Sequence, residues 1–336
     1  MVENCPFEIV LFDLEVVEMD THDTLALEML QEDSRTSLTE IGEKAGLSRF
    51  AVRERVKKLF QDRIILGPTI IVDPILVGFK RTVFFEFKTN PHEPWLAKLL
   101  EKNPSCDLLD GIAGEYSLFG RFRFTDDEHL SRVLKRVDDA MGKSHFKKYR
   151  VVNAIRIFKE AGVAFKPRTE REGLELDEVD FKILEVLLNQ TEFVKAPLPL
   201  STVELSRLLH RLGLEISQPA VFNRLSKLEK KSVILRHTVR VDYSRLGLRS
   251  KFIIRVKANP NVYDVVAQEV LTSMAEISDL YRTGEEYGLL AVLRVRDVSE
   301  YNSFLLKLYN SRDILDTYTT LVLEERKNSP LSFQKD

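Results

Sequence analysis

The sequence is poor in the residues that build metal sites, disulfide frameworks and membrane spans. It has two cysteines, Cys5 and Cys106, and six histidines, and together they form no cluster with the spacing of a zinc site. No apolar run approaches the roughly 18 to 20 residues of a spanning helix. The apolar segment 8–17 is interrupted by acids and lacks a basic lead-in. We therefore expect a cytoplasmic protein with no structural metal and no membrane partner.

Catalytic signatures are also missing. No nucleophile–base pair, phosphate-binding loop or pair of catalytic carboxylates stands out, so the sequence predicts neither a cofactor nor an enzyme. The net charge is only −2, from 50 basic and 52 acidic residues. However, the segment from Arg49 to Arg63 contains six Lys and Arg residues and only two acidic residues. A basic stripe on a nearly neutral protein indicates a focused site for a polyanion.

The chain contains an internal repeat. Four pairs of landmarks are each 169 residues apart, namely Ser48 and Ser217, Leu59 and Leu228, Asp73 and Asp242, and Gly78 and Gly247. A repeat of that length predicts two copies of one two-part unit.

The first part of the first copy has the pattern of a helix-turn-helix. After a short helix over 23–30, Ser37 and Glu40 match the capping box that begins a helix. Gly46 can take the left-handed conformation that ends this helix, and Ser48 can cap a third helix. A helix, a short glycine turn and a second helix are typical of DNA-binding proteins.

The third helix carries the candidate DNA-binding residues. Val52, Val56 and Leu59 form one apolar stripe, so the basic residues between them are expected to face solvent. We expect base-edge contacts from Ser48, Arg49, Phe50 and Arg53, and phosphate contacts from Arg55, Lys57 and Lys58. The alternative is an ordinary solvated helix face.

The second part of each copy is β-rich. Strands are expected over 80–89 and 249–258, helices over 91–103 and 261–274, and glycine hairpins at 114–116 and 284–287. Last strands are expected over 149–158 and 317–323. The order β-α-β-β-α-β is that of the ferredoxin-like unit. Its open sheet face needs a partner, which we expect to be the other copy.

These residues resemble the Lrp/AsnC family of transcription regulators. LQEDSRTSLTEIGEKAGLS and AVRERVKKLFQDRII are similar to its helix-turn-helix signature, and IIVDPILVGF to its connecting strand. The resemblance implies an α+β fold in which two winged or helix-turn-helix domains alternate with two ferredoxin-like sensing domains that form an intrachain pseudo-dimer. The expected bounds are 18–68 and 69–165 for copy one, a linker at 166–178, and 176–238 and 239–328 for copy two.

The family also implies an effector site at the hairpins. Its pattern Gly-x-Tyr-Asp corresponds here to two groups of candidate residues, which are Gly114, Glu115, Tyr116 and Ser117, and Gly284, Glu285 and Tyr287. Ser117 and Gly288 stand where the family has an acid, which disfavours an amino-acid effector because its ammonium needs a carboxylate. A different effector, or none, fits as well, and tight-turn geometry alone would explain the glycines.

The second helix-turn-helix is less basic than the first. It contains twelve extra residues, and its candidate DNA contacts are Ser217, Gln218, Asn223, Arg224 and Lys227. Phe222 replaces the first copy's Arg53. Three roles stay open for it: binding a different half-site, binding weakly, or only completing the pseudo-dimer.

The sequence therefore favours a regulator that binds double-stranded DNA, acts as a homodimer or a higher assembly of pseudo-dimers, and responds to a small molecule or to none. Two alternatives remain. One is a sirohaem decarboxylase on the same architecture, with His145, Lys147, Lys148 and Arg150 near the substrate carboxylates, although a solvated basic turn is the favoured interpretation of these residues. The other is a partner of a related regulator that does not bind DNA.

Overall fold

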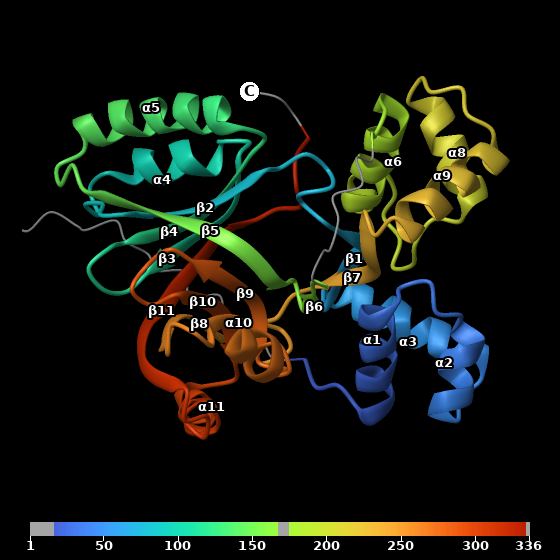
Figure 1. The fold of residues 1–336 in the computed structure, drawn as a ribbon. Coiled ribbons are helices and arrows are strands. Elements are labelled where there is room, and N and C mark those ends of the chain that lie inside the picture. The colour runs from blue at the N-terminus through green and yellow to red at the C-terminus, as the bar shows by residue number, and fades with distance from the viewer. Residues whose placement is uncertain (1–16, 167–174, 334–336) are drawn as a thin grey trace, which may run out of the picture.

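The computed structural model describes residues 17–166 and 175–333. Most of the expected linker, Cys5 and nearly all of the apolar segment 8–17 lie outside these ranges. Within them the chain forms a β-barrel with helices on its outside and, beside it, two helical groups joined by a two-stranded ribbon (Figure 1). No helix in the described part of the chain is both long and apolar enough to cross a membrane.

The first helical group comprises α1 (Thr21–Glu32), α2 (Leu38–Ala45) and α3 (Arg49–Gln61). The predicted turn is confirmed, because Gly46 has a φ of 67° and the Ser48 side chain accepts a hydrogen bond from the Ala51 N–H. Only half of the predicted capping box forms. Ser37 accepts from the Glu40 N–H, whereas the Glu40 carboxylate lies 3.6 Å from the Lys44 ammonium.

The second helical group comprises α6 (Glu178–Leu188), α7 (Gln190–Phe193), α8 (Thr202–Arg211) and α9 (Gln218–Lys230). Helix α7 belongs to the segment that lengthens this group relative to the first. Ser201 and Glu204 complete a capping box at the start of α8. The Ser217 hydroxyl caps α9, with Pro219 in the first turn, where no backbone N–H is needed.

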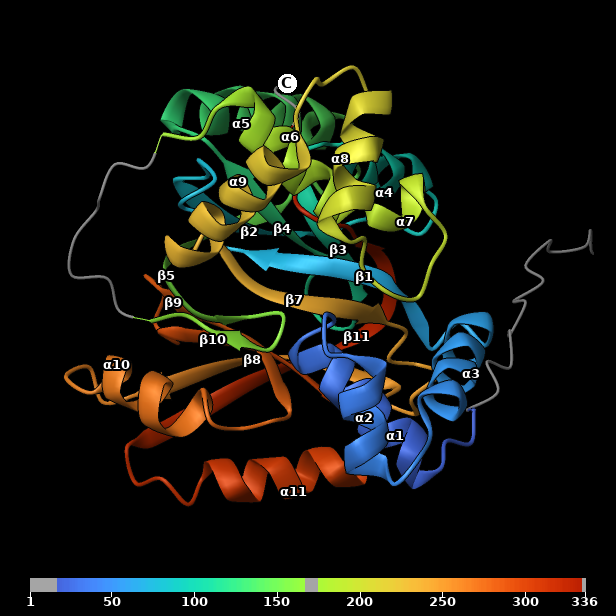
Figure 2. The same cartoon turned by 90° about the vertical axis from the view of Figure 1, so that its right-hand side faces the viewer.

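An antiparallel ribbon of β1 (Ile65–Val72) and β7 (Ile234–Val241) lies between the helical groups and the barrel (Figure 2). Each strand contacts the helical group that precedes the other strand in the chain. The Thr69 hydroxyl in β1 donates to the Leu188 carbonyl at the end of α6, over 2.9 Å. The Thr238 hydroxyl in β7 donates to the Gln31 carbonyl in the last turn of α1, over 2.7 Å. The two helical groups are thus exchanged across the ribbon.

The barrel strands are β2 (Arg81–Phe87), β3 (Cys106–Ile112), β4 (Leu118–Phe124), β5 (Tyr149–Glu160), β8 (Ser250–Ala258), β9 (Ile277–Thr283), β10 (Leu289–Val295) and β11 (Ile314–Asn328). Their order is β2-β4-β3-β11-β8-β10-β9-β5, and β5 pairs back to β2, which closes the sheet. The short β6 (Val163–Ala164) pairs with the end of β5.

Closure goes further than the expected packing of one open sheet face on a partner sheet, because the sheet edges are joined as well. The edge strands β3 and β9 pair with β11 and β5, respectively, so the two four-stranded parts share hydrogen bonds at both edges. Strand β11 runs well beyond the predicted 317–323, since it pairs with β8 along its first half and with β3 along its second. Pairing leaves neither of these edges exposed to other chains.

Helices cover the outside of the barrel (Figures 1 and 2). The helices α4 (Pro94–Glu101) and α5 (Asp127–Lys143) lie on one side, and α11 (Val298–Leu308) lies on the other. The expected helix over 261–274 is replaced by the short α10 (Tyr263–Val265) and a π-helical segment (Val266–Leu271). An apolar layer fills the barrel interior, where Phe84 contacts both Phe119 and Tyr281 at ring-centroid distances of 5.3 and 4.9 Å.

Candidate nucleic-acid interface

Helix α3 presents a basic face to solvent. Val52, Val56 and Leu59 are buried against α1 and α2, as predicted. Ser48, Arg49, Phe50, Arg53, Lys57 and Lys58 are exposed. Lys57 is 3.9 Å from Glu54, on the same helix. In the described part of the chain, Arg49, Arg53 and Lys58 have no ion-pair partner. An exposed cation without a partner can bind phosphate or a base edge without first breaking an internal bond.

Arg55 lies differently from the sequence expectation. Its guanidinium turns back to α1, where it donates hydrogen bonds to Asp23 and Asp20 over 2.8 and 2.6 Å. Its side chain is only 30% exposed, and the hydrogen bonds to Asp23 and Asp20 raise its pKa. Asp20 is also the N-cap of α1. Arg55 therefore fixes α3 to α1, and it would have to leave these two carboxylates to bind phosphate.

The second group repeats this contact. Arg224 in α9 donates hydrogen bonds of 2.7 Å to Asp177 and to Asp180, at the start of α6. Arg55 and Arg224 keep the repeat offset, and the two aspartate pairs share another offset, reduced by the extra residues between them. This recurrence is visible in the sequence, where an Asp-x-x-Asp pattern stands at 20–23 and again at 177–180. Arg224 therefore joins Arg55 as a residue that positions a helix.

Helix α9 retains few free polar side chains. Ser217, Gln218, Asn223 and Lys227 are exposed, and the Gln218 amide donates to the Thr202 hydroxyl over 3.1 Å. The exposed aromatic residue is Phe222, 55% exposed, whereas on α3 it is Phe50, 69% exposed. An aromatic side chain on a reading helix can contact a thymine methyl group. The two helices thus present different chemistry in the same fold.

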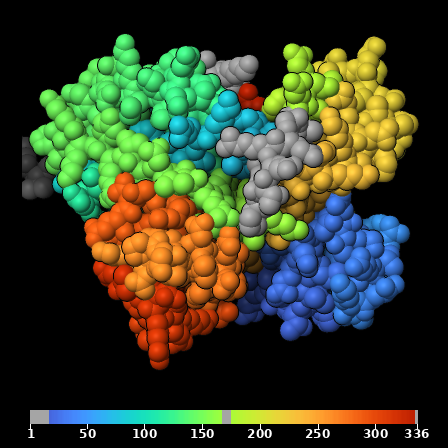
Figure 3. Space-filling model, in the orientation of Figure 1, coloured from blue at the N-terminus to red at the C-terminus, as the bar shows by residue number. Residues whose placement is uncertain are grey.

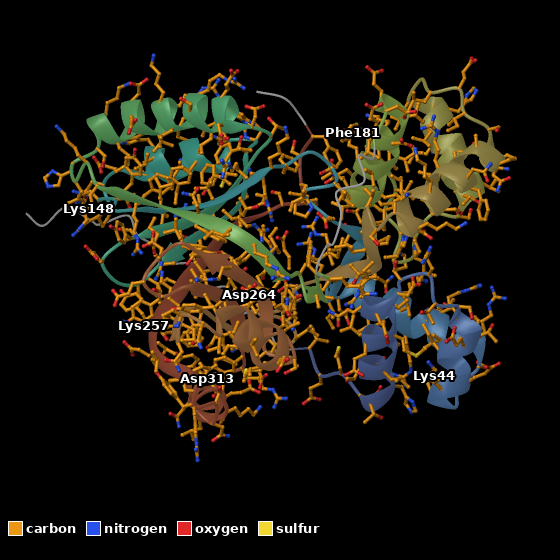
Figure 4. The ribbon with its side chains drawn as sticks, viewed as in Figure 1. Lys44, Lys148, Phe181, Lys257, Asp264 and Asp313 are labelled. Atoms are coloured by element: carbon orange, nitrogen blue, oxygen red, sulfur yellow. The ribbon has the colours of Figure 1, made fainter. Side chains whose placement is uncertain are left out.

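Both helical groups protrude from the same side of the barrel (Figure 3). Figure 4 shows Lys44 on α2, on the part of the first group away from the barrel, whereas Lys148 and Lys257 lie at the opposite end of the molecule. The candidate DNA-binding helices and the predicted effector hairpins are therefore far apart.

At that opposite end, the hairpin side chains are bound to other parts of the chain. Glu115 forms an ion pair with Lys148, whose ammonium lies 5.5 Å from the centre of the Tyr116 ring. The Ser117 hydroxyl exchanges hydrogen bonds with the Thr89 backbone. Gly114 has a φ of 127°, which supports the turn interpretation of that glycine.

The side chains of the second hairpin are also bound to other parts of the chain. Glu285 pairs with Arg150, and the Tyr287 hydroxyl donates to Asp316. Gly284 has no positive φ. In both hairpins the carboxylates are thus already neutralised by cations of the chain. A ligand with an ammonium group would have to displace one of those cations.

A polar cleft of about 940 Å³ lies between the ribbon and the barrel. The ribbon contributes Arg236 and Arg240, and the barrel contributes Arg121 and Lys251. None of its described lining residues is a histidine. His145 lies elsewhere, exposed after α5, where its backbone N–H donates to Glu93. The structure therefore does not bring His145 to this cleft. No group of three or more potential metal-binding residues is present among the described residues.

Comparisons with known proteins match different parts of the chain. The AsnC-type helix-turn-helix domain matches residues 19–59, which contain α1, α2 and most of α3. The Lrp/AsnC ligand-binding domain matches residues 251–331, which contain β8 to β11. The relatives are shorter than this chain, and each matches less than half of it.

Two relatives and one solved structure define the similarity. An uncharacterized HTH-type transcriptional regulator of Pyrococcus abyssi is 32% identical over 152 residues, which are 44% of this chain and 98% of the relative. The HTH-type transcriptional regulator FL11 of Pyrococcus horikoshii is 29% identical, over 46% of this chain and 93% of its own. The siroheme decarboxylase NirDL shares the fold over 93% of this chain and 94% of its own, with a TM-score of 0.63 and 14% identity. From the two domain matches and the near-complete coverage of the Pyrococcus abyssi protein, the chain belongs to the Lrp/AsnC family.

Proposed function

We propose that the chain is a transcription regulator that binds the major groove of double-stranded DNA, mainly through α3. The observation that carries this proposal is the free basic face of α3, where Arg49, Arg53 and Lys58 are exposed and have no ion-pair partner among the described residues. The Gly46 turn and the Ser48 cap place this face on the second helix of a helix-turn-helix. The regulator names of the relatives support the same function.

The proposal includes two units within one chain. The supporting observations are the recurring element order and the reciprocal contacts of Thr69 and Thr238 across the ribbon. The two helix-turn-helix domains span 18–68 and 176–238, and the two ferredoxin-like domains span 69–165 and 239–328, with a linker over 166–178. In this organisation one chain carries the pair of reading helices that a dimer of single units would supply.

The two reading helices differ in strength. Among the described residues, α3 has three exposed cations without an ion-pair partner, whereas α9 has two, Lys227 and Lys230, besides Asn223, and keeps Arg224 in an internal contact. Since phosphate contacts contribute much of the affinity for DNA and its salt dependence, α3 is the main anchor. An operator with unequal half-sites follows from this asymmetry.

Selection from a random DNA pool, followed by titrations at several stated salt concentrations, tests the proposal. Replacing Arg53 with Ala should weaken binding to the selected site by about 1 to 3 kcal/mol if Arg53 contacts a base edge. Lys58→Ala should reduce the slope of log K against log salt by about 0.9, the value for one phosphate contact. Arg132→Ala, which removes an exposed cation from α5, is the matched control.

The outcome that contradicts the assignment to α3 is binding that is indifferent to both substitutions. Asn223→Ala then tests α9. Loss of protection over one half-site only would show that α9 binds DNA, whereas an unchanged footprint would limit the second group to a role in pairing. Two equal palindromic half-sites contacted by one chain would contradict the proposed asymmetry.

An effector and an assembly are further parts of the proposal. A ligand at the hairpins has to compete with the ion pairs of Glu115 and Glu285, so an anionic or neutral molecule that binds Lys148 or Arg150 suits them better than an amino acid. We also propose that pseudo-dimers associate further in the cytoplasm. Native mass spectrometry at several protein concentrations measures that association directly.

Sirohaem decarboxylation is the second candidate function, because the NirDL fold matches nearly the whole chain. Against it, no histidine lines the large cleft among the described residues. The test is a titration of the purified protein with sirohaem, followed by its visible absorbance. A saturable spectral change with loss of the substrate's carboxyl groups as CO₂ would favour the enzyme over the regulator.

A further inference from the structure

The first barrel strands of the two units align without a gap. Residues 78–90 and 247–259 keep the offset of 169 over thirteen positions, which begin with glycine and end with asparagine in both units. This alignment makes Glu86 in β2 equivalent to Arg255 in β8, and Thr82 equivalent to Lys251.

Glu86 and Arg255 touch each other inside the barrel. The Arg255 guanidinium donates a hydrogen bond to Glu86, and the two side chains are 5% and 3% exposed. A residue that contacts its own equivalent lies on the axis that relates the two units. If the two units were identical, this position would hold the same residue twice.

Like charges at such a position would be unfavourable. Two first units would bring Glu86 against another Glu86, and two second units would bring Arg255 against another Arg255. Two like charges would then face each other at a position that is removed from water. Arg150, which lies 3.7 Å from the other oxygen of Glu86, is only one further cation near this carboxylate.

A second contact between the units shows the same asymmetry. Lys251 in β8 binds Asp110 in β3 at 2.7 Å, and both side chains are at most 4% exposed. The residue equivalent to Lys251 is the uncharged Thr82. The residue equivalent to Asp110, at the offset of 171 that holds for β3 and β9, is Tyr281. Pairing two first units would leave Asp110 without its lysine.

A third contact between the units is charged on one side of the axis and apolar on the other. Arg121 in β4 lies 3.3 Å from Asp279 in β9. Their equivalents are Val292 and Leu108, which pack together in the apolar layer inside the barrel. The ion pair is therefore built on one side of the axis only. Pairing two first units would place Arg121 beside the apolar Leu108.

From these three contacts we infer that the barrel interface is specific for two unlike units: the first unit binds the second, from its own chain or from another, and rejects a copy of itself. The inference rests on the two-unit organisation proposed above, and it does not depend on whether the chain binds DNA. The partner that this interface accepts is a unit with an arginine where the first has Glu86.

Charge reversal in the full-length chain tests the pairing rule. Glu86→Arg creates two facing arginines, Arg255→Glu creates two facing glutamates, and the double variant restores opposite charges in reverse order. Each single variant should lower the midpoint of thermal unfolding by about 5 °C or more. The double variant should recover most of that loss. Matched reversals at the exposed pair Glu115 and Lys148 should change the midpoint by about 1 °C or less.

Co-expression of the two single variants provides a second readout. Each chain is mismatched within itself, but exchange of units between the two chains would restore both opposite-charge contacts. The co-expressed pair should therefore unfold closer to the wild-type temperature than either variant alone, as a species with the mass of two chains. Single variants as stable as the wild type, or a double variant no more stable than the single ones, would overturn the inference. DNA binding measured on the same samples reports the proposed function separately.

Discussion

Arg224 is expected to stabilise the second helical group rather than to bind DNA. Its guanidinium donates hydrogen bonds of 2.7 Å to Asp177 and Asp180. The Asp180 side chain is 2% exposed, whereas that of Arg224 is 30% exposed. Replacing Arg224 with Met keeps the apolar stem and removes only the charge and its hydrogen bonds. The substitution leaves the carboxylate of Asp180 buried without a cation.

The size of the effect follows from these contacts. A hydrogen bond to a charged group contributes about 1.5 to 3 kcal/mol when it is buried, and exposed ion pairs contribute less than about 1 kcal/mol. The contact with Asp180 is nearer to the first case and the contact with Asp177 to the second. We therefore expect Arg224→Met to lower the free energy of unfolding of this helical group by about 2 kcal/mol.

Hydrogen exchange of the amides in α6 and α9 measures this loss locally, because opening of the group exposes both helices. Asn223→Ala, the neighbouring exposed position, is the control and should change stability by less than about 0.5 kcal/mol. Adding Asp180→Asn to Arg224→Met should recover part of the loss, since it removes the unpaired charge. Exchange rates in Arg224→Met equal to those of the wild type would refute the reasoning.

Three further predictions concern acid stability, thiol reactivity and the glycine turn. Burial alone would raise the pKa of Glu160, but Arg123 counteracts it and the pKa falls to about 2 from 4.5. The ionised carboxylate therefore contributes on the order of 3 kcal/mol to the free energy of unfolding above pH 4.5, and this contribution is lost as the pH falls toward 2. Glu160→Gln should therefore weaken the fall of the free energy of unfolding with acid, measured by urea unfolding at several pH values. An unchanged dependence on pH would contradict this. Burial raises the pKa of Cys106 to about 12, so iodoacetamide at about pH 8 should leave its peptide unlabelled until the protein unfolds, and rapid native labelling by mass spectrometry would refute this. In thermal unfolding, Gly46→Ala should destabilise the protein by about 1 kcal/mol because Gly46 has a φ of 67°. The control Gly142→Ala, inside α5, should stabilise it slightly. Destabilisation of equal size by both substitutions would count against backbone strain at Gly46.

The sequence predicted those features that depend on neighbouring residues. The turn at Gly46, the cap at Ser48 and the apolar stripe of α3 all depend on contacts within a few positions. Much of the succession of strands and helices after β1 and after β7 also followed from local patterns. Such features are encoded by spacing, which is visible without a structure.

Features that depend on distant partners were missed. Arg55 was placed in solvent because the helical period gives the direction of a side chain but not which neighbouring helix lies there. Its partners, Asp20 and Asp23, are more than thirty positions earlier in the sequence. Barrel closure likewise depends on the pairing of β5 with β9, more than a hundred residues apart. Amphipathic patterns show that an edge or a face is available, but they do not name its partner.

Under the proposed function, in which one chain reads two half-sites, the ribbon sets a length scale for the operator. The first helical group packs near Ile65 and Val239, and the second packs near Ile70 and Val72, toward opposite ends of the strand pair. Eight residues of strand extend about 27 Å, somewhat less than the roughly 34 Å of one turn of B-DNA. Since paired strands do not stretch, two half-sites read by one chain must keep the same helical phase. Inserting about five base pairs between them would rotate one half-site to the far side of the duplex, whereas an insertion of about ten would restore its direction.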